Sequence, residues 1–351
     1  MTSALNKPDT GTRKSLWHYS FIRFKRHKLA FVSSIYLLLL ILISLFAEVI
    51  SPHNPNRQIL EFASKPSFYN CEVIEKKEAN SVKIVPIKKL LKETNSEVYY
   101  VDFLDKEKIE VKANLISKDN KYIFKETFIL GTDKFGRDLL SRLIFGARIS
   151  LSVGLISQAI ALLIGIVLGA FSGYFRGSTD KFIMWLINVV WAFPSILLVI
   201  SISVVLGKGY WQAFVAIGLT SWVEIARIVR GQFITLKESE YVESARALGY
   251  GHLRIIFKHI LPNAVSPVIV TSTVGLANAI IFEASLSFLG LGVQPPMASW
   301  GQMIFDGYKY LITGTNYGMV LYPAIAIMLI VFAVNLMGDG LRDSLDPKLK
   351  K

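Results

Sequence analysis

The sequence has few of the residues that form metal sites or nucleophilic active sites. Its single cysteine, Cys71, excludes an intrachain disulfide and offers no metal-binding cluster. Its five histidines form neither a H-E-x-x-H motif nor an i, i+4 pair, and no G-x-S-x-G motif occurs. We therefore expect no catalytic residue and no metal site in this chain.

A phosphate-binding loop is also missing. Such a loop requires G-x-x-x-x-G-K-[ST], because the lysine reaches the phosphates and the hydroxyl group binds magnesium. The nearest stretch is GTDKFGRD, in which Arg137 and Asp138 stand at those two positions. We expect the chain not to hydrolyse ATP by itself and to bind no cofactor.

Charged residues are scarce: they make up 19% of the 351 residues, whereas hydrophobic residues make up 52%. This composition is typical of a membrane protein. The formal net charge is +13, but the lysines and arginines are scattered between apolar runs and not gathered on one segment. We interpret them as topology signals and solvated loops, and expect no nucleic-acid partner.

Six apolar runs are long enough to span a bilayer. The first, residues 29–47, follows a basic stretch as a signal peptide does, but it lacks a small-x-small cleavage site, which favours a retained helix. The others lie at about 149–175, 182–207, 209–226, 264–289 and 318–338. The sequence therefore predicts an all-α polytopic membrane protein with six transmembrane helices.

The basic residues predict the orientation of these helices. Six crossings place both termini on one side, together with the segment 227–262, which contains six lysines and arginines. By the positive-inside rule this side is the cytoplasm. The predicted divisions are a cytoplasmic segment 1–28, a first helix 29–50, an extracytoplasmic loop 51–147, a helical core 148–339 and a cytoplasmic tail 340–351.

The long loop between the first two helices has its own pattern. The stretches VYYVDFLDKEKIEVKANLIS and KYIFKETFIL alternate apolar and polar residues with period two, which is typical of half-buried strands. A disordered linker is the alternative, but the aromatic residues of these stretches argue against it. We predict a small extracytoplasmic β-rich module.

Gly165, Gly169 and Gly173 recur every four residues in the second apolar run. This spacing puts small residues on one helix face and lets a neighbouring helix approach closely. Chance spacing in a membrane helix is the alternative. We predict helix or subunit packing along this face.

Polar residues inside the later spans indicate a water-filled path, because a carboxamide or carboxylate that faces lipid is costly. The candidates are Asn188, Asn278 and Glu283. Glu283 lies near the outer end of its span and could instead snorkel to the interface or cap a helix.

The charged segment EYVESARALGYGHLRIIFKHILP, residues 240–262, interrupts the apolar runs. It predicts two short amphipathic helices, joined by a reversal at Gly249 and Gly251 and ended by Pro262. Thr235 and Glu238 have capping-box spacing at its start. On the first helix the predicted apolar face consists of Tyr241, Ala245 and Leu248, and on the second of Leu253, Ile256, Phe257, Ile260 and Leu261.

Two explanations of this segment remain open. An amphipathic helix beside a membrane span can lie at the lipid interface. Alternatively, a first helix too short to be stable alone suggests a segment that a partner protein grips from the cytoplasm.

The same residues carry a resemblance. Glu243, Ser244, Ala245 and Gly249, followed by Leu261 and Pro262, resemble the E-A-A-x3-G-x9-I-x-L-P signature of ABC-importer membrane subunits, with Ser244 in place of the usual alanine and His259 in place of the usual isoleucine. Three further stretches are similar to the dipeptide/oligopeptide/nickel permease family, in its oligopeptide permease C-type subunit: ILGTDKFGRDLLSRLIFGARISL, EASLSFLGLGVQPPMASWGQMI and GDGLRDSLDPK.

The resemblance implies a type I ABC importer permease in the bacterial cytoplasmic membrane, with its core at 148–339 and its coupling loop at 235–262. It implies peptide transport, a homologous permease partner, two ATPase subunits that use ATP and magnesium, and an extracytoplasmic peptide-binding protein. The residues it implies for ATPase coupling are Glu243, Ser244, Ala245, Gly249, Gly251, Leu261 and Pro262. Import of nickel or another small solute is the alternative, and an ion-driven carrier or a membrane enzyme is the rival class. Most of 51–128 lies outside the resemblance.

Overall fold

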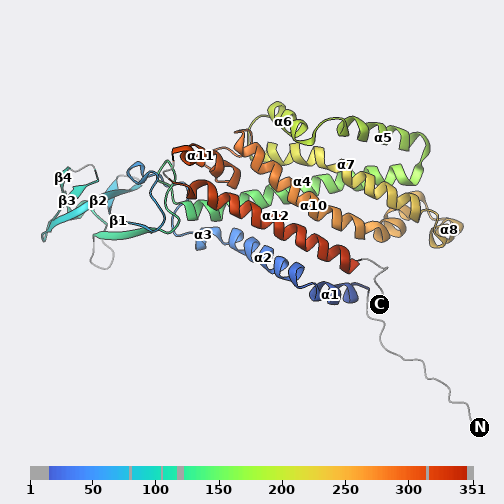
Figure 1. Ribbon diagram of the computed structural model, residues 1–351, viewed down its shortest axis with the longest axis horizontal. Helices are drawn as coiled ribbons and strands as arrows, with labels where there is room; N and C mark the ends of the chain where they lie inside the picture. Colours follow the sequence, from blue (N-terminus) through green and yellow to red (C-terminus); the bar gives the residue numbers. More distant parts are fainter. Residues whose placement is uncertain (1–15, 79–80, 104–105, 117–121, 314–315, 346–351) are drawn as a thin grey trace, which may run out of the picture.

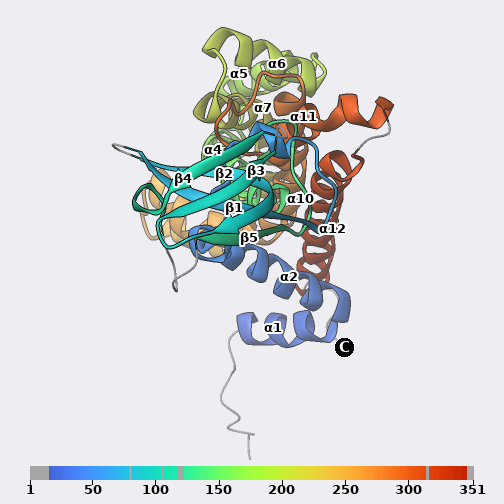
Figure 2. The ribbon, with the colours of Figure 1, turned by 90° about the vertical axis from the view of Figure 1, so that its left-hand side faces the viewer.

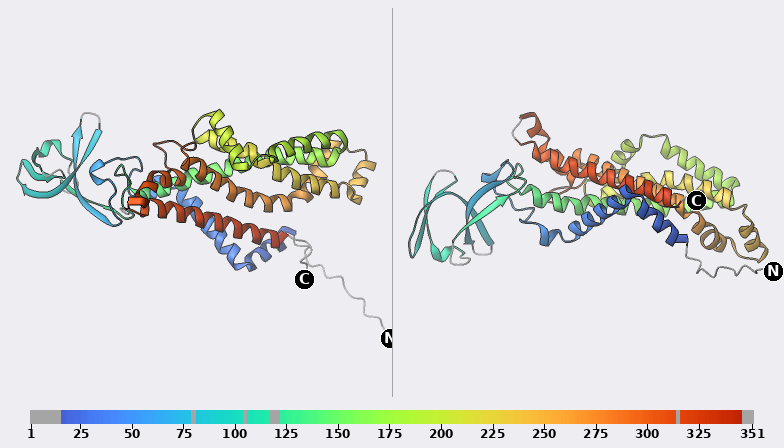
Figure 3. Two further views of the ribbon diagram at one scale, coloured as in Figure 1. Left: turned by 45° about the horizontal axis from the view of Figure 1, so that its top comes forward. Right: turned by 60° about the horizontal axis from the view of Figure 1, so that its bottom comes forward.

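A computed structural model describes residues 16–78, 81–103, 106–116, 122–313 and 316–345. Figure 1 shows an elongated bundle of helices with a β-sheet at one end. The views in Figure 3 keep the same arrangement, and Figure 2 looks onto the sheet with the bundle behind it. The fold therefore has a helical membrane part and one inserted sheet module.

Among the described residues, five helices are long and apolar enough to cross a membrane. They are α2 (Lys28–Leu45), α4 (Leu139–Phe175), α7 (Tyr210–Leu236), the continuous helix His252–Phe288 and α12 (Gly318–Leu345). The continuous helix consists of α9 (His252–Arg254), the π-helical turn η3 (Ile255–Ile260) and α10 (Leu261–Phe288). The shorter helices are α1 (Leu16–Arg26), α3 (Ala47–Ile50), α8 (Glu240–Ala247) and α11 (Trp300–Thr313). The predicted all-α polytopic bundle is confirmed.

The apolar run predicted as one span at 182–207 is a broken helix. It consists of α5 (Gly177–Trp191) and α6 (Ser195–Leu206), which are bent by 89° and make a sixth span if they count as one. Pro194 lies at the break. Because proline has no N–H group and disfavours helix in the residue before it, α5 ends and a new helix begins.

The start of α4 also differs from the predicted span, which began at about 149. Asp138 is the N-cap, and its side chain accepts a 2.9 Å hydrogen bond from the Ser141 backbone N–H. Burial acts to raise the pKa of Asp138, but the His53 ring, with Nδ1 3.4 Å away, and the hydrogen bonds from Ser141 outweigh it and lower the pKa. The helix that follows this cap begins ten residues before the predicted span, so α4 extends from the bundle to the base of the sheet.

Within its described residues, the inserted module is an antiparallel sheet of five strands in the order β4-β3-β2-β1-β5. The strands are β1 (Tyr69–Glu78), β2 (Ser81–Glu93), β3 (Glu97–Asp102), β4 (Glu107–Val111) and β5 (Ile123–Phe128), with the 3-10 turns η1 (Leu60–Phe62) and η2 (Lys112–Asn114) beside them. Strand β3 alternates half-buried and buried side chains, as the period-two pattern predicts. Val98 and Tyr100 on one face join Ile74 and Ile87 in a buried cluster. The predicted β-rich insertion is confirmed.

The contact between α4 and α7 is made at glycines. A Cβ atom on Gly165 would lie 2.8 Å from the Trp222 carbonyl oxygen, and one on Gly173 would lie 2.7 Å from the Arg230 carbonyl oxygen. At Gly169 the distance to the Ala226 carbonyl oxygen would be 2.5 Å. The two backbones therefore approach as closely as only glycine allows.

We expect Gly169→Ala to lower the free energy of unfolding by about 1–3 kcal/mol, because the added methyl group meets backbone that cannot move aside. Gly231 on α7 is the matched control, since a Cβ there has no atom within 4 Å. Gly231→Ala should stabilise the helix by about 0.5–1 kcal/mol. Unfolding of both variants in detergent gives the comparison; shifts of equal sign and size would contradict the packing role.

Candidate functional site

The predicted coupling segment lies at the end of the bundle opposite the sheet, where Figure 1 shows α8. The residue before α8, Ser239, has an extended backbone, and its carbonyl accepts from the Val242 N–H at 2.9 Å. Thr235 instead lies inside α7, and its hydroxyl donates to the Gly231 carbonyl. The predicted capping box of Thr235 with Glu238 is therefore wrong, because α7 continues through that position.

The end of α8 is a Schellman turn. Gly249 has a φ of +76°, its N–H donates to the Arg246 carbonyl at 2.9 Å, and the Tyr250 N–H donates to the Ala245 carbonyl at 3.2 Å. Gly251 has a φ of −65° and an extended backbone, so it does not take part in the reversal. Only Gly249 needs the left-handed conformation that favours glycine.

Pro262 does not end a second short helix. It lies in the first turn of α10, directly after the π-helical turn η3, in which the Leu261 N–H donates to the Ile256 carbonyl. A wide turn tolerates a residue without an N–H group, so the helix continues into the membrane span. The prediction of a separate helix before Pro262 is wrong.

The side chains that face the core agree with the prediction at Ala245, Ile256 and Ile260 and differ from it elsewhere. On α8, Val242 and Ala245 are buried, whereas Leu248 is 71% exposed and Tyr241 is 39% exposed. On the next helix the buried residues are Ile255, Ile256 and Ile260, and the exposed apolar residues are Leu253 and Phe257. The π turn shifts the helical phase. The prediction assumed a regular 3.6-residue repeat, and it therefore placed Leu253 and Phe257 on the buried face instead of Ile255.

The remaining predicted coupling residues lie at the surface or at its edge. Glu243 and Ser244 are exposed, and the Ser244 hydroxyl donates back to the Glu240 carbonyl at 2.9 Å. Leu261 packs in part against the core, and Pro262 is exposed. We define the coupling surface as six of the exposed side chains of this segment: Tyr241, Glu243, Ser244, Leu248, Leu253 and Phe257.

The end of α4 contacts the residues that come directly before and after α8. The Tyr174 carbonyl accepts from Lys237 Nζ at 2.6 Å, and the Tyr174 hydroxyl lies 2.9 Å from His252 Nδ1. Arg176 donates to Glu238 at 2.8 Å. Burial, followed by the charges of Arg246 and Arg176, lowers the pKa of Lys237. The residues directly before and after α8 are therefore held against the end of α4.

The three path candidates lie in different surroundings. Asn278 lines a cavity of about 120 Å³ between α4, α6, α7 and α10. Asn188 is exposed on α5 and is not part of that cavity wall. Glu283 is fully buried, and its carboxylate accepts from Ser150 at 2.9 Å and from Ser287 at 2.8 Å. It therefore joins α4 to α10 and does not snorkel.

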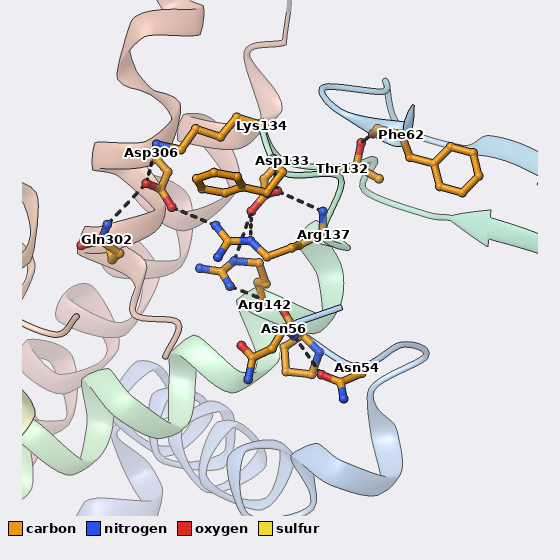
Figure 4. Close-up of polar contacts among 12 residues, drawn as sticks. Asn54, Asn56, Phe62, Thr132, Asp133, Lys134, Arg137, Arg142, Gln302 and Asp306 are labelled. Atoms are coloured by element: carbon orange, nitrogen blue, oxygen red, sulfur yellow. Dashed lines mark hydrogen bonds and ion pairs between the residues drawn. The ribbon is translucent and has the colours of Figure 1, made fainter. Parts of the chain in front are cut away.

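A buried charge cluster at the other end of the bundle was missed in the sequence. Arg137 donates from Nε to Asp133 at 2.6 Å and from a terminal nitrogen to Asp306 at 3.1 Å. Arg142 Nε lies 3.5 Å from Asp133, and Lys134 Nζ lies 2.9 Å from Asp306. Figure 4 shows these side chains, from the loop before α4, from α4 and from α11, pointing toward one another. The charges of the stretch TDKFGRDLLSR beside a membrane span were the available signal.

The cluster also attaches the sheet module. The Thr132 hydroxyl donates to the Phe62 carbonyl and accepts from the Lys65 N–H. Asn316, at the start of the last helical segment, donates to the Lys65 carbonyl at 3.1 Å. Arg142 donates to the Pro55 carbonyl at 3.2 Å. Sheet, α4 and the α11–α12 region thus meet around one charge network.

Asp133→Ala should lower the free energy of unfolding by about 3–5 kcal/mol, because it leaves Arg142 buried without its carboxylate. Glu48 is the matched control: it pairs with Arg148 at 3.2 Å, but the pair is exposed. Glu48→Ala should change stability by less than about 1 kcal/mol. Unfolding in detergent compares the two, and equal losses would contradict a special role of the buried pair.

Comparison with known proteins places the chain among transport proteins. Residues 165–351 match the family described as binding-protein-dependent transport system inner membrane component, and residues 15–66 match the N-terminal TM domain of oligopeptide transport permease C. The oligopeptide transport system permease protein OppC of Bacillus subtilis (strain 168) is 38% identical over 338 residues, which cover 96% of this chain and 91% of that protein. This coverage extends through most of 51–128, which the resemblance in the sequence motifs did not.

Two further proteins are similar over shorter stretches. The glutathione transport system permease protein GsiD of Pectobacterium atrosepticum is 44% identical over 221 residues, 63% of this chain and 73% of that protein. A solved structure of the MetNI methionine ABC transporter in an inward-facing conformation has a TM-score of 0.50 at 20% identity, over 59% of this chain and 98% of that chain. The structural likeness shows the fold, that of a type I ABC importer permease.

Proposed function

Because the chain belongs to the family of binding-protein-dependent transport system inner membrane components, we propose that it is the permease subunit through which an ATP-driven importer moves peptides. The observation that carries this proposal is the 38% identity to an oligopeptide permease along 96% of the chain, sheet module included. Relatives named for oligopeptide, dipeptide and glutathione transport support peptides over nickel as the substrate class.

The coupling surface is the proposed docking site for the ATPase subunits. Four exposed apolar side chains lie beside the exposed carboxylate of Glu243 on one short helix and the helix that follows it. Such a surface suits a partner protein that covers apolar area and donates a hydrogen bond to the carboxylate. The sequence has no phosphate-binding loop, so the ATP and magnesium of the transport cycle are bound by these partners.

Coupling then proceeds from α8 into the bundle. When the ATPases close on ATP they displace α8, and the contacts of Lys237 and His252 with Tyr174 move the end of α4. Because α4 and α7 touch backbone to backbone, they move as a pair. The equilibrium between inward and outward states shifts only if the ATPases contact α8 differently in the two states.

The remaining partners follow the same proposal. A homologous permease subunit completes the membrane core, one of two ATPase subunits docks at the coupling surface of this chain and the other on the homologous subunit, and an extracytoplasmic peptide-binding protein delivers the substrate at the sheet end. The end that contains α8, α1 and the end of α12 is then cytoplasmic, and the sheet is extracytoplasmic (Figure 1). The basic residues of segment 227–262 support this orientation.

Reconstitution tests the function. The permease pair, the ATPases and the binding protein are placed in proteoliposomes, and uptake of labelled trialanine is measured with ATP and with a non-hydrolysable analogue. We expect uptake only with ATP and the binding protein. Uptake driven by an ion gradient without ATPases, or transport of nickel but of no peptide, would refute the proposal.

Thiol labelling tests the orientation and carries a pH dependence. Burial and then the Glu126 charge raise the pKa of Cys71 to about 12 from an ordinary 9.0, so its thiolate is roughly 1,000-fold less abundant at neutral pH. Cys71 should therefore react slowly with a thiol reagent in sealed cells, and its labelling rate should rise about tenfold for each unit by which the pH is raised.

The orientation is tested with two introduced cysteines. An impermeant maleimide should label Ser96→Cys in the exposed β2–β3 turn rapidly, but not Arg342→Cys near the end of α12. The reverse labelling pattern would overturn the orientation.

Gly249→Val should uncouple ATP hydrolysis from transport. A β-branched residue at φ +76° strains the turn by about 1–3 kcal/mol and changes the direction of α8. Gly251→Val is the control, since its φ of −65° suits any residue and a Cβ there has no neighbour within 4 Å. Uptake per ATP hydrolysed is the measurement; similar values for both variants would show that the turn geometry does not matter.

A further inference from the structure

The cavity that contains Asn278 has a polar wall inside an apolar bundle. Most of its polar lining residues come from α4, α7 and α10: Gln158, Thr220, Ser221, Glu224, Thr271 and Asn278. Its volume of about 120 Å³ is enough for several water molecules or for part of a peptide.

Gln158 is the unusual member of this wall. The residue is 6% exposed, and neither Oε1 nor Nε2 has a hydrogen-bond partner in the described part of the chain. An unpaired buried carboxamide is costly, and more so in a protein surrounded by lipid. The carboxamide therefore has a donor and an acceptor left for a molecule bound in the cavity.

Gly275 on α10 keeps room for this carboxamide. A Cβ atom on Gly275 would lie 2.5 Å from Gln158 Oε1 and 2.9 Å from Nε2. Any other residue at this position would displace the amide group. The glycine and the glutamine thus form one built feature on two facing helices.

The break between α5 and α6 forms the remaining wall. Trp191, the last residue of α5, and Ser195, the first of α6, both line the cavity. The Arg227 guanidinium lies 3.9 Å from the centre of the Trp191 ring, which holds the indole in place. Irregular backbone at membrane depth is tolerated where it lines a cavity, so the 89° bend and the cavity belong together.

We propose that this cavity is a site on the translocation path that recognises the peptide backbone through Gln158, an inference that rests on the proposed import of peptides. In an extended peptide the N–H and C=O of one residue point to the same side, as in a strand pair that exchanges both hydrogen bonds. A carboxamide presents one acceptor and one donor side by side. Gln158 Oε1 accepts from the peptide N–H, and Nε2 donates to the C=O of the same residue. Contact with the backbone alone lets peptides of different sequence pass.

The test uses an isosteric change in the substrate. Uptake of trialanine is compared with uptake of two depsipeptide analogues, in which an ester oxygen replaces one or the other amide N–H. The complete complex in proteoliposomes is used, with the parent chain, Gln158→Met or Gly275→Ala. The same binding protein serves every variant, so its own preference for the amide cancels in the comparison of amide-to-ester ratios between variants.

The ratio of trialanine uptake to ester uptake should be about 2- to 10-fold higher in the parent than in Gln158→Met for at least one ester. This difference is the effect expected for the loss of one hydrogen bond. Gly275→Ala should lower the ratio in the same direction, and it keeps the test decisive if the methionine variant fails to assemble. Ser157 is the matched control: its hydroxyl is buried on the same helix without a hydrogen-bond partner among the described residues, but it does not line the cavity. Ser157→Ala should keep the parent ratio.

Two results would overturn the inference, and they are distinguishable. Peptide uptake with equal ratios in the parent, Gln158→Met and Gly275→Ala would mean that water satisfies the carboxamide; the proposed function would then stand and only the backbone site would fall. A parent complex that imports neither trialanine nor its esters would overturn the proposed function together with this site.

Discussion

The close contact of α4 with α7 is the constraint on which the rest of the bundle depends. With 37 residues α4 is about 56 Å long, well beyond the roughly 30 Å of hydrocarbon that a span must cross. Its first turn lies in the charge cluster beside the sheet, and its last turn holds α8. The glycines in its second half fix it to α7, so both ends of the molecule are connected through one rigid helix pair.

The membrane fold could be predicted from the sequence because it depends on local signals. Apolar runs of sufficient length and period-two alternation specified the spans and the sheet without any knowledge of tertiary contacts. Where prediction failed, the backbone departed from regular geometry. The sequence alone did not show that the proline at 194 would end α5 with a sharp bend, or that the proline at 262 would follow a π turn and leave its helix intact.

The candidate site was predictable only in part, for a similar reason. The family signature placed the coupling residues, and Gly249 could be assigned a turn from residue type alone. The burial pattern around it depended on the π turn, which moved Leu253 and Phe257 to the surface. The charge cluster joins Arg137 to Asp306, which lie 169 residues apart in the sequence. Gln158 differs from other buried polar residues of the cavity wall because its carboxamide has no hydrogen-bond partner among the described residues. Long-range pairing of this kind has no local pattern in a single sequence.

The π turn at Ile255–Ile260 has a consequence for the phase between the two ends of its helix. One extra residue in a helical turn rotates everything that follows by about 100° relative to an uninterrupted α-helix. Leu253, before the turn, belongs to the coupling surface, and the residues after the turn include Gly275 and Asn278 on the cavity wall. The extra residue therefore sets the angle about the helix axis between the exposed side chain at one end of this continuous helix and the cavity wall further along it.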